Sequence, residues 1–369
     1  MRYYIIAGEA SGDLHGSNLI KEIYKLDSNA KIKAWGGDKM QSAGAKIVKH
    51  YKKLSFMGFY EVFKNLNTIL KNIKFCKKDI LNFNPDKIIF IDYPGFNMRI
   101  AKWAKKNKFN TNYYIAPQIW AWNEKRINNI RDNIDNLYVI LPFEKKYFER
   151  KHNFPVKFLG HPLLDSIEEF KKHEAKDFFE KHKLNNQKKI ISILPGSRKQ
   201  EIKKILRVML EVIENFPKYQ FVIAGAPSIN LKFYQDIIKN KNVSVIKNET
   251  YALLSNSRAA LVTSGTATLE ASVFKIPQVV CYKTSFISYF LAKIFVKIKF
   301  ISLVNLIMDE EIIKELIQSK CSKQNIIKEL KKVLDLEKRN NLMSKYDELI
   351  SLLGSSGSSR RVAKDIVLK

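Results

Sequence analysis

The sequence predicts an α/β protein with two domains, each built on a doubly wound parallel sheet. Short apolar runs alternate along the chain with stretches of helical periodicity, which is typical of parallel strands joined by right-handed crossovers. This alternation occurs in two series, one in each half of the chain. The length of 369 residues also exceeds the size at which a single hydrophobic core usually stops growing.

The expected strands are short apolar runs bounded by turn-forming residues. In the first half they cover 3–7, 87–92, 113–115, 136–140 and 156–159, and in the second half 189–194, 220–224, 243–246, 259–263 and 278–282. The first helix is expected from about Leu14.

The junction between the domains is expected near Gly160-His161-Pro162, where the first series of strands ends. A charged helical stretch around 168–183 follows it. We therefore expect a first domain over 1–165 and a second over 166–354. A flexible Gly/Ser turn begins at Gly354, and we expect the segment 355–369 to form a last helix that packs back on the first domain.

The charge of the chain is strongly positive, with a formal net value of +29 at pH 7. Of the 65 Lys and Arg residues only 11 are Arg, whereas proteins that bind nucleic acid usually depend on Arg for bidentate contacts. Two explanations of the Lys surplus are compatible: nucleotide bias of the genome, or attraction to anionic lipids and phosphorylated substrates. Nucleic acid is not an expected partner.

Cysteine usage and hydropathy indicate a reducing, cytoplasmic location. Cys76, Cys281 and Cys321 form no paired motif, so neither a disulfide nor a zinc site is predicted. The apolar start is too short for a signal peptide, and no window of about 20 residues lacks charge. The segments 54–73 and 286–300 combine apolar, aromatic and basic residues, so they are either membrane-surface helices or ordinary amphipathic helices.

Two motifs follow strands of the first half. Gly8-Glu9-Ala10-Ser11-Gly12-Asp13 opens the first helix, where small residues and free N–H groups favour an anion. The alternative is a tight turn with Asp13 in the first helical turn. Asp92 ends the strand 87–92, and its carboxylate either acts as a general base toward an acceptor hydroxyl or caps the next turn.

Two motifs also follow strands of the second half. In Leu194-Pro195-Gly196-Ser197-Arg198 a turn exposes backbone donors beside a guanidinium suited to a diphosphate, unless it is an ordinary surface loop. Ser264-Gly265-Thr266 begins a helix and places Glu270 one turn later, where it can accept hydrogen bonds from two ribose hydroxyls. A capping box is the alternative, but it needs an acid three residues after the cap.

A further segment, 116–126, is rich in aromatic and basic side chains. Trp120 and Trp122 can stack on sugars, and Lys125 and Arg126 can pair with phosphate. Core packing beside a solvated basic helix explains such a cluster equally well.

In combination these motifs resemble the family of lipid-A-disaccharide synthases. GEASGDLHG, IDYPGFN, APQIWAW, LPFEKKYF, GHPLLD, LPGSRKQE, SGTATLE and SLVNLI occur in one order from residue 8 to about residue 307. The resemblance implies two Rossmann-like domains whose sheets face a central cleft, as in glycosyltransferases of GT-B type. It implies inverting, metal-independent and cofactor-free transfer of 2,3-diacylglucosamine from its UDP donor to 2,3-diacylglucosamine 1-phosphate (lipid X), with release of UDP.

The resemblance also implies roles for individual residues. Asp92 matches a catalytic Asp. The nucleotide-sugar site comprises Gly196, Ser197, Arg198, Ser264, Gly265, Thr266, Glu270 and Asn305. The acceptor side comprises Glu9, Ser11, Gly12, Asp13, Trp120, Trp122, Lys125 and Arg126. Some members have a second acid where Gly95 stands here, so Gly95 receives no catalytic role.

Acylated substrates imply peripheral contact with the anionic inner membrane, on its cytoplasmic face, and a homodimer is left open. The nearest rival functions are other UDP-N-acetylglucosamine enzymes of the same architecture, the 2-epimerase and the peptidoglycan transferase. A non-catalytic basic protein that binds anionic lipid is a rival of another class.

Overall fold

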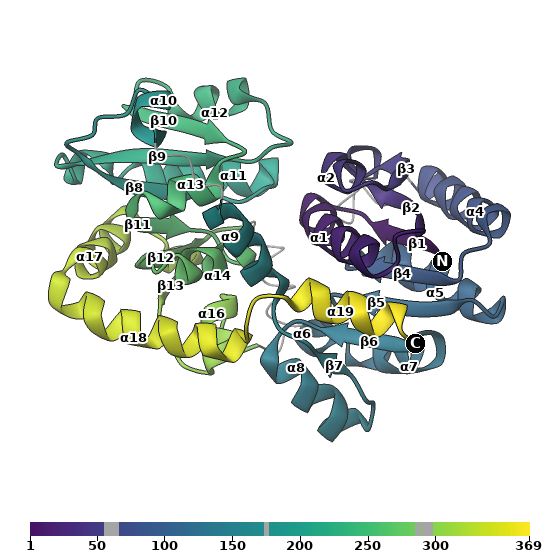
Figure 1. The fold of residues 1–369 in the computed structure, drawn as a ribbon. Helices are drawn as coiled ribbons and strands as arrows, with labels where there is room; N and C mark the ends of the chain where they lie inside the picture. The colour runs from purple at the N-terminus through teal and green to yellow at the C-terminus, as the bar shows by residue number, and fades with distance from the viewer. Residues whose placement is uncertain (55–65, 173–176, 285–288, 290–297) are drawn as a thin grey trace. The chain divides into compact units, whose positions relative to one another are not determined.

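The computed structural model describes residues 1–369 except 55–65, 173–176, 285–288 and 290–297. It divides the chain into two compact units (Figure 1). Unit 1 comprises Met1–Glu168 and Leu353–Lys369, and unit 2 comprises Glu169–Leu352. Each unit has its own sheet and its own hydrophobic core.

Unit 1 is built on a seven-stranded parallel sheet with the order β3-β2-β1-β4-β5-β6-β7. Its central strands are almost wholly buried because helices cover both faces, which is why they are continuous apolar runs. Ile5 of β1 pairs with Ala34 on one side and with Ile89 on the other. The strands are β1 (Arg2–Ala7), β2 (Lys31–Gly36), β3 (Lys46–His50), β4 (Lys87–Ile91), β5 (Asn110–Tyr114), β6 (Asn136–Val139) and β7 (Lys157–Phe158).

The helices of unit 1 alternate with these strands. They are α1 (Ala10–Leu26), α2 (Asp38–Ser42), α4 (Leu66–Phe83), α5 (Pro94–Lys106), α6 (Ile119–Trp122), α7 (Ile127–Asn133), α8 (Pro142–Lys146) and α9 (Pro162–Lys172), the last of which continues into unit 2. Single turns of 3-10 or π helix lie at Tyr51–Lys53, Glu124–Arg126 and Tyr147–Lys151.

The C-terminal helix α19 (Ser358–Val367) belongs to unit 1, where it packs against α1 (Figure 1). Its start is held by Asp165, whose carboxylate accepts hydrogen bonds from the backbone N–H groups of Gly357, Ser358 and Ser359 at 2.6 to 3.1 Å. Its end is held by Asp365, which accepts a hydrogen bond of 2.7 Å from the Tyr138 hydroxyl on β6.

Unit 2 is built on a six-stranded parallel sheet with the order β10-β9-β8-β11-β12-β13. Its strands are β8 (Lys189–Leu194), β9 (Tyr219–Gly225), β10 (Val243–Lys247), β11 (Ser257–Val262), β12 (Gln278–Tyr282) and β13 (Lys314–Ile317). Its helices are α10 (Phe178–Lys181), α11 (Lys199–Leu210), α12 (Leu231–Ile238), α13 (Thr250–Ser255), α14 (Thr266–Val273), α16 (Leu303–Met308), α17 (Lys323–Leu334) and α18 (Leu336–Leu353). Short 3-10 turns lie at Ile213–Asn215 and Gln318–Lys320.

The two doubly wound parallel sheets confirm the predicted fold class. All the expected strands are present within a few residues of their expected ends, but β2, β3 and β13 were not predicted. These strands carry lysines or glutamate between their apolar residues, and β3 and β13 are edge strands. A short strand with a charged face lacks the apolar run by which a buried parallel strand is recognised.

No helix among the described residues has the length and apolar character needed to cross a bilayer. Most of each membrane-surface segment, expected at 54–73 and at 286–300, lies outside the described residues. Residues 66–73 of the first segment form the start of α4. Cys76, Cys281 and Cys321 are buried free thiols.

Candidate functional site

Each sheet has one point at which the winding of the chain reverses. In unit 1 the first strand, β1, has β2 on one side and β4 on the other; in unit 2 the first strand, β8, has β9 on one side and β11 on the other. Open α/β sheets bind ligands just beyond the carboxyl ends of the strands at such a reversal. The motifs of the first half follow β1 and β4, and those of the second half follow β8 and β11.

In unit 2 the turns after β8 and β11 touch each other. The Thr263 backbone N–H donates a hydrogen bond of 2.9 Å to the Leu194 carbonyl. A Cβ atom built on Gly196 would lie 3.3 Å from the Thr263 methyl group, so no larger residue fits there without movement. Gly196 also has a φ of +100°, which favours glycine. The two predicted nucleotide motifs therefore form one surface.

The start of α14 presents backbone donors to that surface. Gly265 precedes the helix with a φ of +109°, and a Cβ atom there would meet nothing within 4 Å, so the turn borders open space. Gly265, the residue at the N-cap position, has no side chain with which to cap the N–H groups of the first turn. Uncapped N–H groups at a helix start favour a bound anion. Ser264 and Thr266 flank Gly265 and place two hydroxyls beside these donors.

Arg198 precedes α11, next to Gly196, and its side chain is more than half exposed. Its guanidinium lies 3.2 Å from the Glu201 carboxylate, one turn further along. Tyr282, at the end of β12, lies close to both: burial raises the pKa of its hydroxyl, Glu201 raises that pKa further and Arg198 opposes the change. Ser197 is exposed in the same turn. Glu201 and Tyr282 were not predicted as site residues.

Glu270 lies one turn into α14, and it is partly accessible. Burial of the carboxyl group raises its pKa to about 7, and the neighbouring Tyr251 hydroxyl lowers it in part. The Tyr251 ring contacts Phe274 and Phe170, with ring centroids 5.5 and 5.8 Å apart respectively. Because Glu270 as a residue keeps partial access to solvent, its carboxyl group can exchange hydrogen bonds with the hydroxyls of a sugar that binds beside these aromatic rings.

Asn305 is fully buried, and its side-chain amide uses its whole hydrogen-bonding capacity inside the protein. The amide nitrogen donates to the Ile313 carbonyl and to Glu315 at 2.8 and 2.9 Å. Its oxygen accepts from the N–H groups of Ile312 and Ile313 at 2.9 and 3.0 Å. Direct contact between Asn305 and a nucleotide, as expected from the sequence, would require these hydrogen bonds to break. We therefore interpret Asn305 as a residue that positions the loop around it.

In unit 1, Asp92 directly follows β4 in an uncommon backbone conformation. Asp92 and Tyr93 have φ values of +46° and +51°, which side chains other than glycine rarely adopt. The Asp92 carbonyl oxygen accepts hydrogen bonds from the Tyr113 hydroxyl at 2.6 Å and from the Asn97 amide at 2.7 Å, which hold this turn. Strained backbone of this kind concentrates at functional sites.

The Asp92 carboxyl group binds protons more readily than an ordinary Asp. Burial raises its pKa, and a hydrogen bond from the Tyr93 backbone N–H lowers it in part. The side chain is nevertheless not fully buried. A carboxylate with a raised pKa at the carboxyl end of a strand is suited to accept a proton from a hydroxyl group.

The motif after β1 divides into structural and accessible residues. Gly12 packs helix α1 against β1, since a Cβ atom there would lie 3.0 Å from that of Ala7. Asp13 is buried, and its carboxylate accepts hydrogen bonds from the N–H groups of Gly37, Lys39 and Met40 at 2.7 to 3.1 Å. Gly12 and Asp13 therefore shape the turn, and the acceptor-binding role expected for them stays a prediction. Glu9 and Ser11 remain accessible.

The aromatic segment after β5 is anchored by a buried acid that sequence reasoning missed. The Trp120 indole N–H donates a hydrogen bond of 3.0 Å to Glu144, and the Trp120 ring meets Phe143 edge-on. The same carboxylate accepts from the N–H groups of Ile140 and Leu141. Glu144 is fully buried, which raises its pKa to about 7. A detectable signal was Pro at the first and Glu at the third position of α8.

Lys125, Arg126 and Trp122 are the other residues expected on the acceptor side, and the structure shows fewer contacts for them. Lys125 is exposed, and Arg126 lies near Tyr113, where its charge partly opposes the rise in the Tyr113 pKa that burial causes. The side chain of Trp122 lies outside what the structure describes. Within the described part of the chain, no group of three or more His, Cys, Asp or Glu side chains is arranged to hold a metal ion.

The chain has two doubly wound parallel sheets, and the turns at the reversal point of each sheet lie where such sheets bind ligands. This architecture defines the class of protein: the chain has the GT-B fold of glycosyltransferases and related epimerases. The family model described as Lipid-A-disaccharide synthetase matches residues 3–367. The chain belongs to this family, and it is therefore a glycosyltransferase.

Curated relatives agree with this assignment. The chain is 34% identical over 329 residues to lipid-A-disaccharide synthase 1 of Legionella pneumophila (strain Paris), with 87% of this chain and 85% of the relative covered. It is 33% identical over 368 residues to lipid-A-disaccharide synthase of Coxiella burnetii (strain CbuG_Q212), with 98% and 96% covered.

Solved structures share the fold at lower identity. UDP-GlcNAc 2-epimerase from Neisseria meningitidis, bound to UDP-GlcNAc, has a TM-score of 0.73 at 16% identity, and both chains are fully covered. The glycosyltransferase of kitacinnamycin has a TM-score of 0.67 at 12% identity, with 99% of this chain and 98% of that chain covered.

Proposed function

We propose that the protein transfers 2,3-diacylglucosamine from its UDP donor to 2,3-diacylglucosamine 1-phosphate, giving a β-1,6-linked disaccharide 1-phosphate and UDP. Family membership supports the reaction class, and the names of the Legionella and Coxiella relatives support the product. The observation that carries the proposal is the contact between the Gly196 and Gly265 turns at the reversal point of unit 2, which forms a surface suited to a nucleoside diphosphate.

The diphosphate of UDP would lie over these two turns. Backbone N–H groups at the start of α14 and the hydroxyls of Ser197, Ser264 and Thr266 supply hydrogen-bond donors, and Arg198 supplies a positive charge with fork geometry. Glu270 would accept hydrogen bonds from the ribose hydroxyls. This arrangement assigns the neutralisation of the diphosphate to the protein itself, without a metal ion.

Asp92 is the general base of the proposal. The 6-hydroxyl oxygen of the acceptor attacks the anomeric carbon of the donor while its proton passes to the Asp92 carboxylate. The bond from that carbon to the UDP oxygen breaks, its electron pair leaves with UDP, and the anomeric configuration inverts. The raised proton affinity of Asp92 favours this transfer, and Arg198 stabilises the charge that develops on UDP.

The acceptor is assigned to accessible residues of unit 1. Glu9 and Ser11 border the same strand ends as Asp92, and Trp120 is fixed by Glu144 in the turn after β5. Lys125 and Arg126 are the proposed partners of the acceptor phosphate.

Peripheral contact with an anionic membrane, on its cytoplasmic face, is part of the same proposal because both substrates carry acyl chains. The helix α4 supports it with exposed apolar side chains, including Leu70 and Phe75, that are 54% and 48% accessible. Lys71, Lys74 and Lys78 are exposed on the same helix. Apolar and basic side chains together are typical of helices that lie in a lipid interface.

The test is UDP release from UDP-2,3-diacylglucosamine, measured with and without the acylated acceptor. The proposal predicts release that depends on 2,3-diacylglucosamine 1-phosphate. A 2-epimerase would instead convert UDP-N-acetylglucosamine to its epimer without an acceptor, and that result would replace the proposal.

A further inference from the structure

A cavity of about 300 Å³ lies in unit 2 at the amino ends of two central strands. Four cationic side chains line it: Lys188 and Lys189 at the start of β8, Arg258 at the start of β11, and Arg339 on α18. None of the described residues that line this cavity is Asp or Glu. The nucleotide motifs follow the carboxyl ends of the same strands, so the cavity is a separate place, roughly 20 Å away along β8.

The four cations have no anionic partner among the described residues. Lys188 donates a hydrogen bond of 3.0 Å to the Pro217 carbonyl, which leaves its charge uncompensated. Lys189, Arg258 and Arg339 form no ion pair with any described residue. The positive charge that lines the cavity is therefore uncompensated by the described part of the protein.

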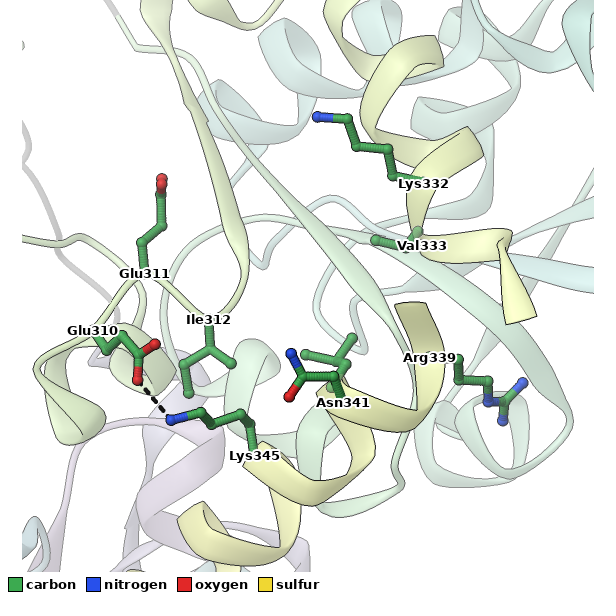
Figure 2. A pocket seen from close by; sticks show the side chains of 9 residues that line it. Glu310, Glu311, Ile312, Lys332, Val333, Arg339, Asn341 and Lys345 are labelled. Atoms are coloured by element: carbon green, nitrogen blue, oxygen red, sulfur yellow. Dashed lines mark hydrogen bonds and ion pairs between the residues drawn. The ribbon is translucent and has the colours of Figure 1, made fainter. Parts of the chain in front are cut away.

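A neighbouring cavity of about 230 Å³ is also lined by cationic side chains, but acidic side chains balance the charge of most of them (Figure 2). Arg339 lines it too, but its other cations have acidic partners: Lys345 lies 2.8 Å from Glu310, and Lys332 lies 2.8 Å from Glu329. Figure 2 shows the Lys345–Glu310 pair on one side and the Arg339 side chain directed away from it. The surplus of positive charge therefore belongs to the first cavity.

We propose that the first cavity binds the phosphate group of an anionic ligand, at a site distinct from the proposed nucleotide site. Two guanidinium groups offer the fork geometry that matches phosphate oxygens, and two ammonium groups add point charges. The volume accommodates a phosphate or diphosphate group. An anion there would relieve the repulsion among the four cations.

The test uses inorganic pyrophosphate as the probe and the full chain as the protein. Binding is measured by equilibrium dialysis without UDP, because the diphosphate of UDP would compete for the proposed cavity. The nucleotide site is weakened instead by Arg198→Gln, and we expect wild type and Arg198→Gln to share a pyrophosphate site whose affinity falls as salt increases. Arg258→Gln and Arg339→Gln should each lower its affinity at least tenfold. Lys232→Gln, which removes an exposed charge on α12, is the matched control and should change it little.

Two further arms identify the source of the phosphate. Co-sedimentation with phosphatidic acid vesicles that is lost in Arg258→Gln and competed by pyrophosphate identifies a lipid headgroup. Pyrophosphate binding with vesicle binding unchanged in both variants identifies a soluble phosphate compound. Absence of pyrophosphate binding in Arg198→Gln overturns the proposal, as does equal binding by wild type and by Arg258→Gln and Arg339→Gln variants whose melting temperatures match wild type.

Discussion

The Tyr113 hydroxyl donates a 2.6 Å hydrogen bond to the carbonyl oxygen of Asp92, and so joins the ends of two adjacent strands, β4 and β5. This bond holds Asp92 in its left-handed conformation while leaving the carboxylate to the site. Tyr113 is fully buried, which raises the pKa of its hydroxyl, so it remains a neutral donor at all physiological pH values. The chemistry proposed for Asp92 therefore depends on a rigid backbone.

Replacement of that carboxylate gives the first prediction. Asp92→Asn keeps the shape of the side chain but removes the base, so transfer should fall by about 100- to 10,000-fold. UDP affinity should not change. The variant should be at least as stable as wild type at neutral pH, because burial disfavours the charged form of Asp92. Kinetics, calorimetry with UDP and thermal unfolding check these three expectations.

The matched control for that variant is Asp132→Asn, which changes an exposed carboxylate in the same unit. It should retain wild-type transfer. Near wild-type activity of Asp92→Asn would remove Asp92 from the mechanism and leave the fold and the nucleotide site unaffected.

Arg198 is expected to carry much of the affinity for the diphosphate. A charge-assisted hydrogen bond contributes about 1.5–3 kcal/mol, so Arg198→Gln should weaken UDP binding by about 10- to 100-fold. Calorimetric titration with UDP measures this. Arg207→Gln, an exposed residue on the same helix, is the control. If both variants bind UDP equally well, the diphosphate lies elsewhere.

Glu270 should act on the ribose alone. Glu270→Gln is predicted to lower the affinity for UDP by about tenfold, since a carboxylate that accepts from two hydroxyls is replaced by an amide. Its effect on 2′,3′-dideoxy-UDP should be small, because that analogue has no hydroxyls to donate. Wild type and Glu270→Gln are each titrated with UDP and with 2′,3′-dideoxy-UDP. If the substitution lowers the affinity for both ligands equally, Glu270 does not bind the ribose hydroxyls.

Glu144 should make the stability of the protein depend on pH. Its pKa is raised to about 7 in the folded chain, against about 4.3 when unfolded. Folding therefore favours the protonated form of Glu144. The stability that this preference contributes is fully present below about pH 4 and is lost as pH rises through 7. The loss is on the order of 3 kcal/mol. Glu144→Gln should lack this component.

Denaturant unfolding of wild type and Glu144→Gln between pH 4 and pH 8 measures that component as the difference between the two proteins. The variant should also alter Trp120 fluorescence, because its indole N–H faces a different acceptor. A pH-independent difference in the free energy of unfolding would mean that the pKa of Glu144 is the same in the folded and unfolded chains, which would contradict the raised value.

The fold was largely predictable because its central strands are buried on both faces. β1, β4, β8 and β11 are apolar runs that end in turn-forming residues, and this pattern alone identified both halves of the protein. β2, β3 and β13 escaped prediction because lysines and a glutamate interrupt their apolar residues. Local sequence cannot distinguish such strands from loops, since their pairing depends on neighbours far along the chain.

Residue type and strand end coincide at Asp92, Gly196 and Gly265, and the roles predicted for these three residues stay predictions. Asp13 and Asn305 also lie in these motifs, but their side chains form hydrogen bonds with backbone N–H groups of the protein itself. The partners of Asp13 are 24 or more residues away along the chain, and those of Asn305 are seven or eight residues away. Those partners become neighbours only in the folded chain. Glu144 was also overlooked, because its role in holding Trp120 depends on a tertiary contact between residues 24 positions apart.

Mass analysis of the product tests the central claim most directly. The full chain is incubated with UDP-2,3-diacylglucosamine and 2,3-diacylglucosamine 1-phosphate. The account predicts one tetraacylated disaccharide 1-phosphate for each UDP released, formed by wild type and not by Asp92→Asn. Recovery of both substrates unchanged, or release of UDP with a free acylated monosaccharide as the only other product, would contradict it.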